Sequence, residues 1–249
     1  MTGSPRRPTS GRPAEVRPSF IGTERTSAGQ PVSVCIVRID LTQELNDIDR
    51  KVTELFSLVS EGLAAATDAL LSGDFDTASS VVARERLIDS LYYDIEALLQ
   101  RQFALASPAA MDMRYLLAML RIVPELERSG DLVEHIANRA LRGIGAELTP
   151  RLRGLVERMG RVGVMLWRGA AESYVSRDPF KVGELRNLDN ELDELHVALI
   201  AEIVEAELRL PTAIEMALVA RFLERLGDHA VNVANRMRYV ATGEHGPTH

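Results

Sequence analysis

The stretch that decides the fold is residues 220–236, ARFLERLGDHAVNVANR, because a related stretch lies 97 positions earlier. Residues 125–139 read ELERSGDLVEHIANR, so both stretches contain E-R-x-G-D and, further on, A-N-R. A second match, at an offset of 104, pairs residues 85–91, ERLIDSL, with residues 189–195, DNELDEL. Self-similarity of this kind indicates two copies of one structural unit.

Both copies carry the pattern of helices. From about Leu41 onward, apolar side chains recur every three or four residues, which is typical of amphipathic helices. Gly73 and four proline-containing breaks divide this region into six predicted helices, of about residues 41–72, 74–103, 111–144, 150–177, 179–209 and 211–242. We expect Asp74, Thr149 and Asp178 to open the second, fourth and fifth helices.

The repeat and the helical pattern together predict an all-α fold of two tandem three-helix bundles, residues 39–146 and 147–243. Residues 1–38 are rich in Pro, Ser, Gly and Arg and lack helical periodicity. We expect them to form a disordered basic tail.

Composition restricts the protein's environment. Cys35 is the only cysteine, which excludes an intramolecular disulfide and a cysteine-based metal site. The N-terminus lacks the apolar core of a signal peptide, and no apolar run approaches the roughly 20 residues of a membrane helix. We expect a cytoplasmic protein without membrane insertion.

Charge is distributed unevenly along the chain. Residues 1–39 hold six arginines against two acidic residues, a balance of +4. Because the whole chain has 29 basic and 36 acidic residues, the remainder holds 23 against 34, a balance of −11. Such an acidic body argues against nucleic acid as a partner and favours cations or basic protein surfaces.

Each matched helix contains an acidic residue followed four positions later by aspartate, which places both on one face of the helix. The four pairs are Glu85/Asp89, Glu127/Asp131, Asp189/Asp193 and Glu224/Asp228. Like charges at this spacing repel, so a cation held between facing helices would stabilise them. Magnesium, manganese, iron and zinc ions all accept carboxylate ligands. Gly130 and Gly227 would let a neighbouring helix approach.

At these residues the chain resembles the PhoU family of phosphate-signalling regulators. Residues 220–236 are very close to the family's second-repeat signature, residues 125–131 look like the first, and residues 112–114 are similar to the acid–apolar–Arg element before it. The resemblance covers about residues 41–242.

The resemblance implies two three-helix bundles, with metal ions held by the eight acidic residues named above. It also implies a negative regulator, not an enzyme, that links the ATPase subunit of the phosphate ABC transporter to a phosphate-sensing histidine kinase. The resemblance further implies dimers or higher oligomers, and we expect a homodimer. Two departures stand out: Ser129 occupies a position that is usually aliphatic, and Pro124 lies within the third helix. We expect Pro124 to kink that helix and weaken the first metal site.

Two other functions compete with this interpretation. A di-iron carboxylate enzyme would need Glu-x-x-His pairs, but the nearest match is residues 193–196, DELH, and the first-half counterpart ends in Tyr92. A metal-free helical scaffold would dock basic partners directly on its acidic faces. Metal content separates the scaffold from the metal-binding regulator.

Overall fold

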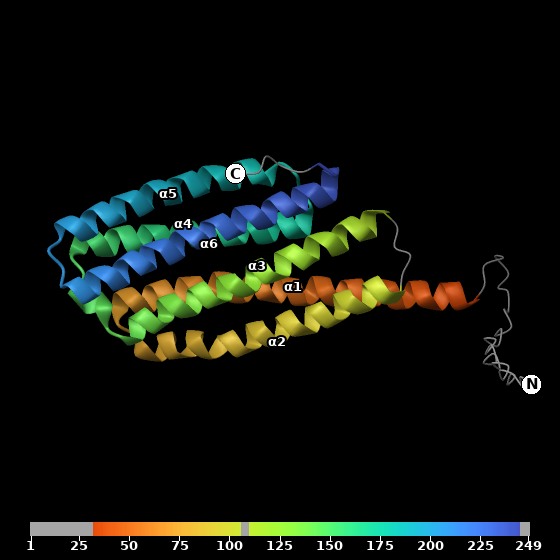
Figure 1. Cartoon of the computed structure of the whole chain (residues 1–249), viewed down its shortest axis with the longest axis horizontal. Helices are drawn as coiled ribbons and strands as arrows, with labels where there is room; N and C mark the ends of the chain where they lie inside the picture. Colours follow the sequence, from red (N-terminus) through yellow and green to blue (C-terminus); the bar gives the residue numbers. More distant parts are fainter. Residues whose placement is uncertain (1–31, 106–109, 245–249) are drawn as a thin grey trace, which may run out of the picture. The chain divides into compact units, whose positions relative to one another are not determined.

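The computed structural model describes residues 32–105 and 110–244, with side chains described over 43–104 and 113–244. Within these ranges the chain contains helices and no strands, which confirms the predicted all-α class (Figure 1). The elements are α1 (Val32–Ser72), α2 (Phe75–Leu105), α3 (Ala110–Leu141), the short 3-10 helix η1 (Ile144–Glu147), α4 (Pro150–Ser176), α5 (Lys181–Glu205) and α6 (Leu210–Thr242).

Among the described residues, those from Gln43 onward form one compact unit that contains both repeats, and the start of α1 belongs to a separate unit. Most of the predicted tail, residues 1–31, lies outside the described residues. The helix α1 begins at Val32, earlier than the predicted Leu41. The predicted start was later because prolines recur up to Pro31 and residues 1–38 lack a helical period.

Two predicted helix starts are confirmed by their capping hydrogen bonds. Asp74 Oδ1 accepts hydrogen bonds from the backbone N–H groups of Asp76, at 3.1 Å, and Thr77, at 3.0 Å. Thr149 Oγ1 accepts one from the N–H of Leu152 at 3.2 Å, with Pro150 in the first turn. These side chains satisfy N–H groups that have no partner within the helix.

Two other predicted boundaries were wrong. Asp178 does not cap α5, because it lies in the preceding turn, where its Oδ1 accepts a hydrogen bond from the N–H of Phe180 at 2.9 Å. The third helix ends at Leu141 rather than Ile144, because Gly143 adopts a left-handed conformation with φ of 71°.

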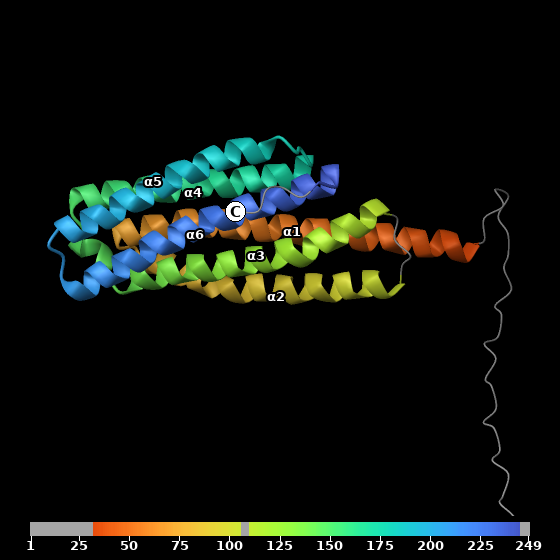
Figure 2. The ribbon, with the colours of Figure 1, turned by 45° about the horizontal axis from the view of Figure 1, so that its top comes forward.

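Within the compact unit, the second and third helices of each repeat pack together, as α2 with α3 and α5 with α6. The two repeats meet along α3 and α6, which lie side by side in Figures 1 and 2. They also meet where the Phe56 ring of α1 lies 6.1 Å from Trp167 and 5.4 Å from Tyr174 of α4. The third helix of each repeat therefore contacts its own second helix and the other repeat.

One described segment, Gln43–Ser72 of α1, is long and apolar enough to cross a membrane by length and composition alone. The search for unbroken apolar runs missed it, since its apolar residues are interspersed with polar ones. Half of its most apolar 18-residue stretch is buried inside the protein. Ile48, Val52 and Leu55 of this segment belong to the core. A buried core helix produces the same compositional signal.

Candidate metal centres

The first two acidic pairs face each other across the packing of α2 on α3. The pKa of Glu85 is raised to about 7, first by burial and then by the negative charges of Asp89 on its own helix and Asp131 on the neighbouring one. The pKa of Glu127 is also raised, by burial and then by Asp131 and Asp89. The structure therefore brings together the four residues that the sequence predicted, as one cluster, which we call the first carboxylate cluster.

Two further residues belong to the surroundings of this cluster. Glu134 adds negative charge near Glu85 and Asp131, whereas His135 lowers the pKa of Asp131 against the larger effect of burial. His135 Nδ1 lies 3.7 Å from Glu134 Oε2. Sequence analysis missed both residues, although they follow Asp131 by three and four positions and so share its side of the helix.

The second carboxylate cluster lies between α5 and α6. The pKa of Asp189 is raised to about 7 by burial and then by Asp193, Asp228 and Glu224, in that order. The pKa of Glu224 is raised by burial and Asp228, while Arg221 and His196 act in the opposite direction. All four predicted residues of the second repeat are therefore electrostatically coupled across two helices.

Arginine and glycine make the second cluster different from the first. Arg221 forms an ion pair with Glu224 Oε1, while the buried Oε2 of Glu224 has no hydrogen-bond partner. A Cβ atom at Gly227 would lie 2.7 Å from Asp189 Oδ1, so glycine here leaves room for the Asp189 side chain. At Gly130 the neighbour is instead the Ile88 Cδ1 methyl, at 2.7 Å. The prediction that both glycines admit a neighbouring helix is confirmed.

The chemistry of both clusters fits a hard or borderline cation, because carboxylate oxygens predominate and the facing charges repel one another. The partnerless Glu224 oxygen is a free acceptor of this kind. Over residues 43–104 and 113–244, no three Asp, Glu, His or Cys side chains already converge as a coordination shell. Binding a cation would therefore involve rotation of these side chains.

The departures noted in the first repeat have structural counterparts. The helix α3 continues through Pro124 without interruption. The hydroxyl of Ser129 donates to the carbonyl oxygen of Glu125 at 2.6 Å and lies 2.9 Å from Nδ1 of His229, and both side chains are buried. Burial and two nearby arginines lower the pKa of His229 to about 4, which keeps the ring neutral. This polar link between the repeats was not evident from the sequence.

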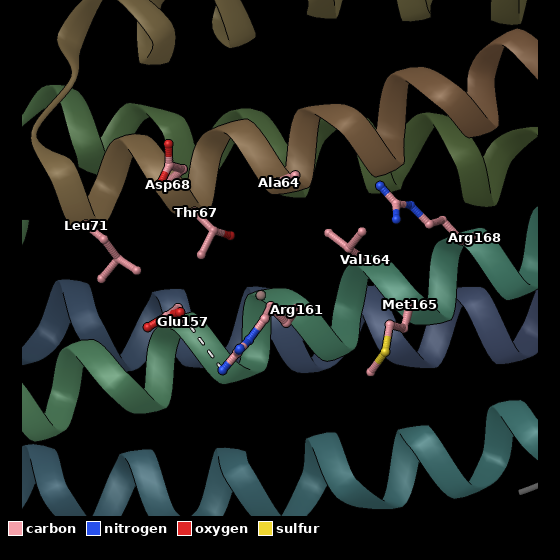
Figure 3. A pocket seen from close by; sticks show the side chains of 10 residues that line it. Ala64, Thr67, Asp68, Leu71, Glu157, Arg161, Val164, Met165 and Arg168 are labelled. Carbon is pink, nitrogen blue, oxygen red and sulfur yellow. Dashed lines mark ion pairs between the residues drawn. The ribbon is translucent and has the colours of Figure 1, made fainter.

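A separate groove of about 400 Å³ lies between α1 and α4 (Figure 3). Its polar lining includes Asp68, Glu157 and Arg161, and the last two form an ion pair at 4.0 Å. None of the eight predicted metal ligands lines it. The groove is therefore distinct from both carboxylate clusters.

The comparison with protein families agrees with this duplicated architecture. The PhoU domain model matches residues 52–140 and again residues 156–237. The chain belongs to the PhoU family. The two matches also coincide with the two repeats recognised in the sequence.

Individual relatives are similar over most of their length. PhoU homolog 1 of Mycobacterium leprae, described as a phosphate-specific transport system accessory protein, is 32% identical over 81% of this chain and 92% of its own. PhoU homolog 2 of Mycobacterium tuberculosis is 32% identical over 81% of this chain and 96% of its own. The crystal structure of PhoU from Pseudomonas aeruginosa superposes with a TM-score of 0.76, at 25% identity, over 82% of this chain and 99% of that one.

Proposed function

We propose that this PhoU-family protein is a cytoplasmic, non-enzymatic negative regulator of phosphate uptake and signalling. It links the ATPase subunit of a phosphate ABC transporter to a phosphate-sensing histidine kinase, and keeps phosphate-starvation genes silent when phosphate is plentiful. The mycobacterial relatives support this proposal, because they are described as accessory proteins of phosphate-specific transport.

The observation that carries the proposal is the pair of carboxylate clusters at equivalent places in the two repeats. Glu85 and Asp189 are the cluster members whose pKa is raised most, to about 7. Each cluster therefore places more carboxylates together than can all stay ionised without a large energetic cost. The carboxylates of each cluster would hold iron, zinc, manganese or magnesium ions, which supply the missing positive charge. A filled cluster would hold its two helices together more firmly.

The regulatory role is tested in the native host by deleting the gene and measuring a phosphate-starvation reporter at high phosphate. We expect the reporter to become active in the deletion strain and silent again when the wild-type protein is restored. Affinity purification at high phosphate should recover a phosphate-transporter ATPase or a phosphate-responsive histidine kinase. A reporter that stays silent in the deletion strain would contradict the proposal.

We also propose that the protein acts as a homodimer. Leu210, Ile214 and Leu218 support this, because they are exposed and follow one another at intervals of four along α6, on one face of the helix. Light scattering coupled to gel filtration should give twice the mass of the 27.5 kDa chain. A monomer at about 50 µM, well above typical dimer dissociation constants, would contradict it.

A further inference from the structure

The two third helices carry arginines on a side that adjoins the carboxylate clusters, about a quarter turn around each helix. Arg128 and Arg225 directly follow Glu127 and Glu224, so they point about 100° around the helix from them. Arg121 lies two turns before Arg128 on α3, and Arg236 lies three turns after Arg225 on α6. Three of these side chains are exposed and Arg236 is half-buried. We call Arg121, Arg128, Arg225 and Arg236 the arginine face.

The packing of α3 against α6 brings this set together. The two helices run antiparallel, because Ser129 meets His229 at 2.9 Å while Arg139, further along α3, meets Glu215, further back along α6, at 3.1 Å. The same register places Arg121 opposite Arg236. Arg121 is close enough to oppose the positive charge of Arg236, whose pKa is lowered by burial and then by this neighbour.

The internal repeat allows Arg236 to be compared with an arginine at the equivalent position of the first repeat. Arg139 and Arg236 are equivalent at the offset of 97. Arg139 forms an ion pair with Glu215 at 3.1 Å and lies over the ring of Phe222 at 4.9 Å. The position equivalent to Glu215 in the first repeat is Ala118, which offers no carboxylate. Arg236 therefore lacks the partner that its counterpart has.

The other arginines of the set share this property. Across the side chains that the structure describes, none of the four forms a salt bridge or a side-chain hydrogen bond, whereas Arg139 and Arg221 on the same two helices both pair with glutamate. Two carboxylates lie nearby. Asp228 belongs to the second carboxylate cluster, and Glu125 is half-buried, with an Oε2 atom that accepts no hydrogen bond. The face therefore carries more positive than negative charge in an otherwise acidic protein.

Apolar side chains lie beside these charges. Leu117 and Leu120, within one turn of Arg121, are 43% and 45% exposed. Arginine binds carboxylates through two parallel hydrogen bonds, and an adjoining leucine adds apolar contact area. A small inorganic anion would use the guanidinium groups but not the leucines.

We propose that the arginine face, together with Leu117 and Leu120, docks an acidic protein segment that also carries apolar side chains. Assigning the segment to a regulatory partner rests on the proposed function, but the binding itself does not. The partner is recognised by complementary charge, on the side of α3 and α6 that the carboxylate clusters leave free. The docked partner would thus adjoin both cation sites, which α3 shares with α2 and α6 shares with α5.

The test uses a fluorescein-labelled 16-residue peptide built from Glu-Leu-Glu-Glu repeats, and fluorescence anisotropy with the full chain at 50 mM salt. We expect Arg121→Gln/Arg236→Gln to weaken binding at least 10-fold. Arg128→Gln/Arg225→Gln provides a second variant at exposed positions, should the first fail to fold. The matched control, Arg86→Gln/Arg168→Gln, removes the same charge from exposed arginines elsewhere and should change binding less than 3-fold.

Three outcomes would overturn the proposal. Equal weakening by both face variants and the control would mean that only net charge matters. Displacement of the peptide by 10 mM phosphate, but not by chloride of equal ionic strength, would indicate a small-anion site. Equal binding of a peptide with serine in place of leucine would remove the apolar contribution. Failure of the reporter experiment with peptide binding intact would instead reject the regulatory role and leave the docking surface standing.

Discussion

The two carboxylate clusters arise from the same sequence pattern and yet differ in charge. The first has five carboxylates, because Glu134 joins the four predicted residues, and no arginine forms an ion pair with any of them among the described side chains. The second has four, and Arg221 pairs with Glu224. A repeat thus preserves the placement of the acids while their neighbours set the balance of charge.

This difference bears on metal affinity. Cation affinity rises with the number of charged ligands, so the first cluster should bind more tightly. Sequence analysis predicted the opposite, on the ground that Pro124 distorts α3. We rank the two clusters by their charges, because α3 is not broken at Pro124; the expected kink at Pro124 stays a prediction.

The largest expected effect comes from neutralising one cluster at a time. Glu85→Gln/Asp131→Asn should weaken the tighter class of Mn²⁺ binding at least about 100-fold, because each lost carboxylate removes a ligand and its charge. Asp189→Asn/Asp228→Asn should remove the weaker class. Isothermal titration of each variant with Mn²⁺ measures the affinity of both classes of binding. Glu54→Gln/Asp76→Asn, which alters exposed acids elsewhere, should leave both classes unchanged, and loss of the same class in both cluster variants would contradict the ranking.

Replacing the glycine beside each cluster with alanine should change the free energy of unfolding by different amounts. At Gly227 a Cβ would collide with Asp189 and with Leu192, whose Cδ2 would be 2.6 Å away, so Gly227→Ala should lower the free energy of unfolding by about 2 kcal/mol. At Gly130 a Cβ would meet one side chain, Ile88, at its Cδ1 (2.7 Å) and Cγ2 (3.1 Å), whereas at Gly227 it would meet three side chains. Both variants gain about 1 kcal/mol of helix propensity, so Gly130→Ala should lower the free energy of unfolding less than Gly227→Ala. Urea denaturation of both variants tests this, and equal losses would argue against the closer approach at the second cluster.

The raised pKa values predict how stability depends on pH. In metal-free protein, Glu85 and Asp189 bind protons in the folded state up to about pH 7, whereas in the unfolded chain they ionise near 4.5 and 3.8. The folded state therefore binds more protons between these limits, and its stability should fall as pH rises from about 5 to about 7.5. Because both groups retain contact with solvent, we expect a loss of only about 1 kcal/mol.

Denaturation at several pH values in the presence of a chelator measures how the free energy of unfolding changes with pH. Asp189→Asn should flatten this dependence, and Asp76→Asn, an exposed acid on α2, should not. Stability that rises across the same pH range would contradict the coupling of the carboxylates.

The smallest expected effect concerns the charge that distinguishes the second cluster. Arg221→Gln removes the ion pair to Glu224 and should strengthen Mn²⁺ binding there about 3-fold, in keeping with the modest energy of a partly exposed ion pair. Arg168→Gln is the control, since Arg168 is also exposed and lies on α4. Weaker binding in Arg221→Gln would mean that the arginine positions Glu224 rather than competing for it.

The helices could be predicted from local periodicity, and the repeat from motifs that recur 97 and 104 positions apart. The acidic pairs could be predicted because they fall at equivalent positions of the repeat. Sequence analysis misplaced the start of α5, since an Asp-Pro pair suits a turn as well as a helix start. It also missed the contact of Ser129 with His229 and the convergence of Arg121 with Arg236. Each of these depends on how one repeat packs on the other, which no spacing within a single helix reveals.

The central claim, that the facing carboxylates of each repeat hold cations, is tested most directly by anomalous diffraction from crystals soaked with Mn²⁺. We expect one peak between Glu85/Asp89 and Glu127/Asp131, and a second, of lower occupancy, between Asp189/Asp193 and Glu224/Asp228. Fully occupied peaks elsewhere, with neither cluster occupied, would contradict the account.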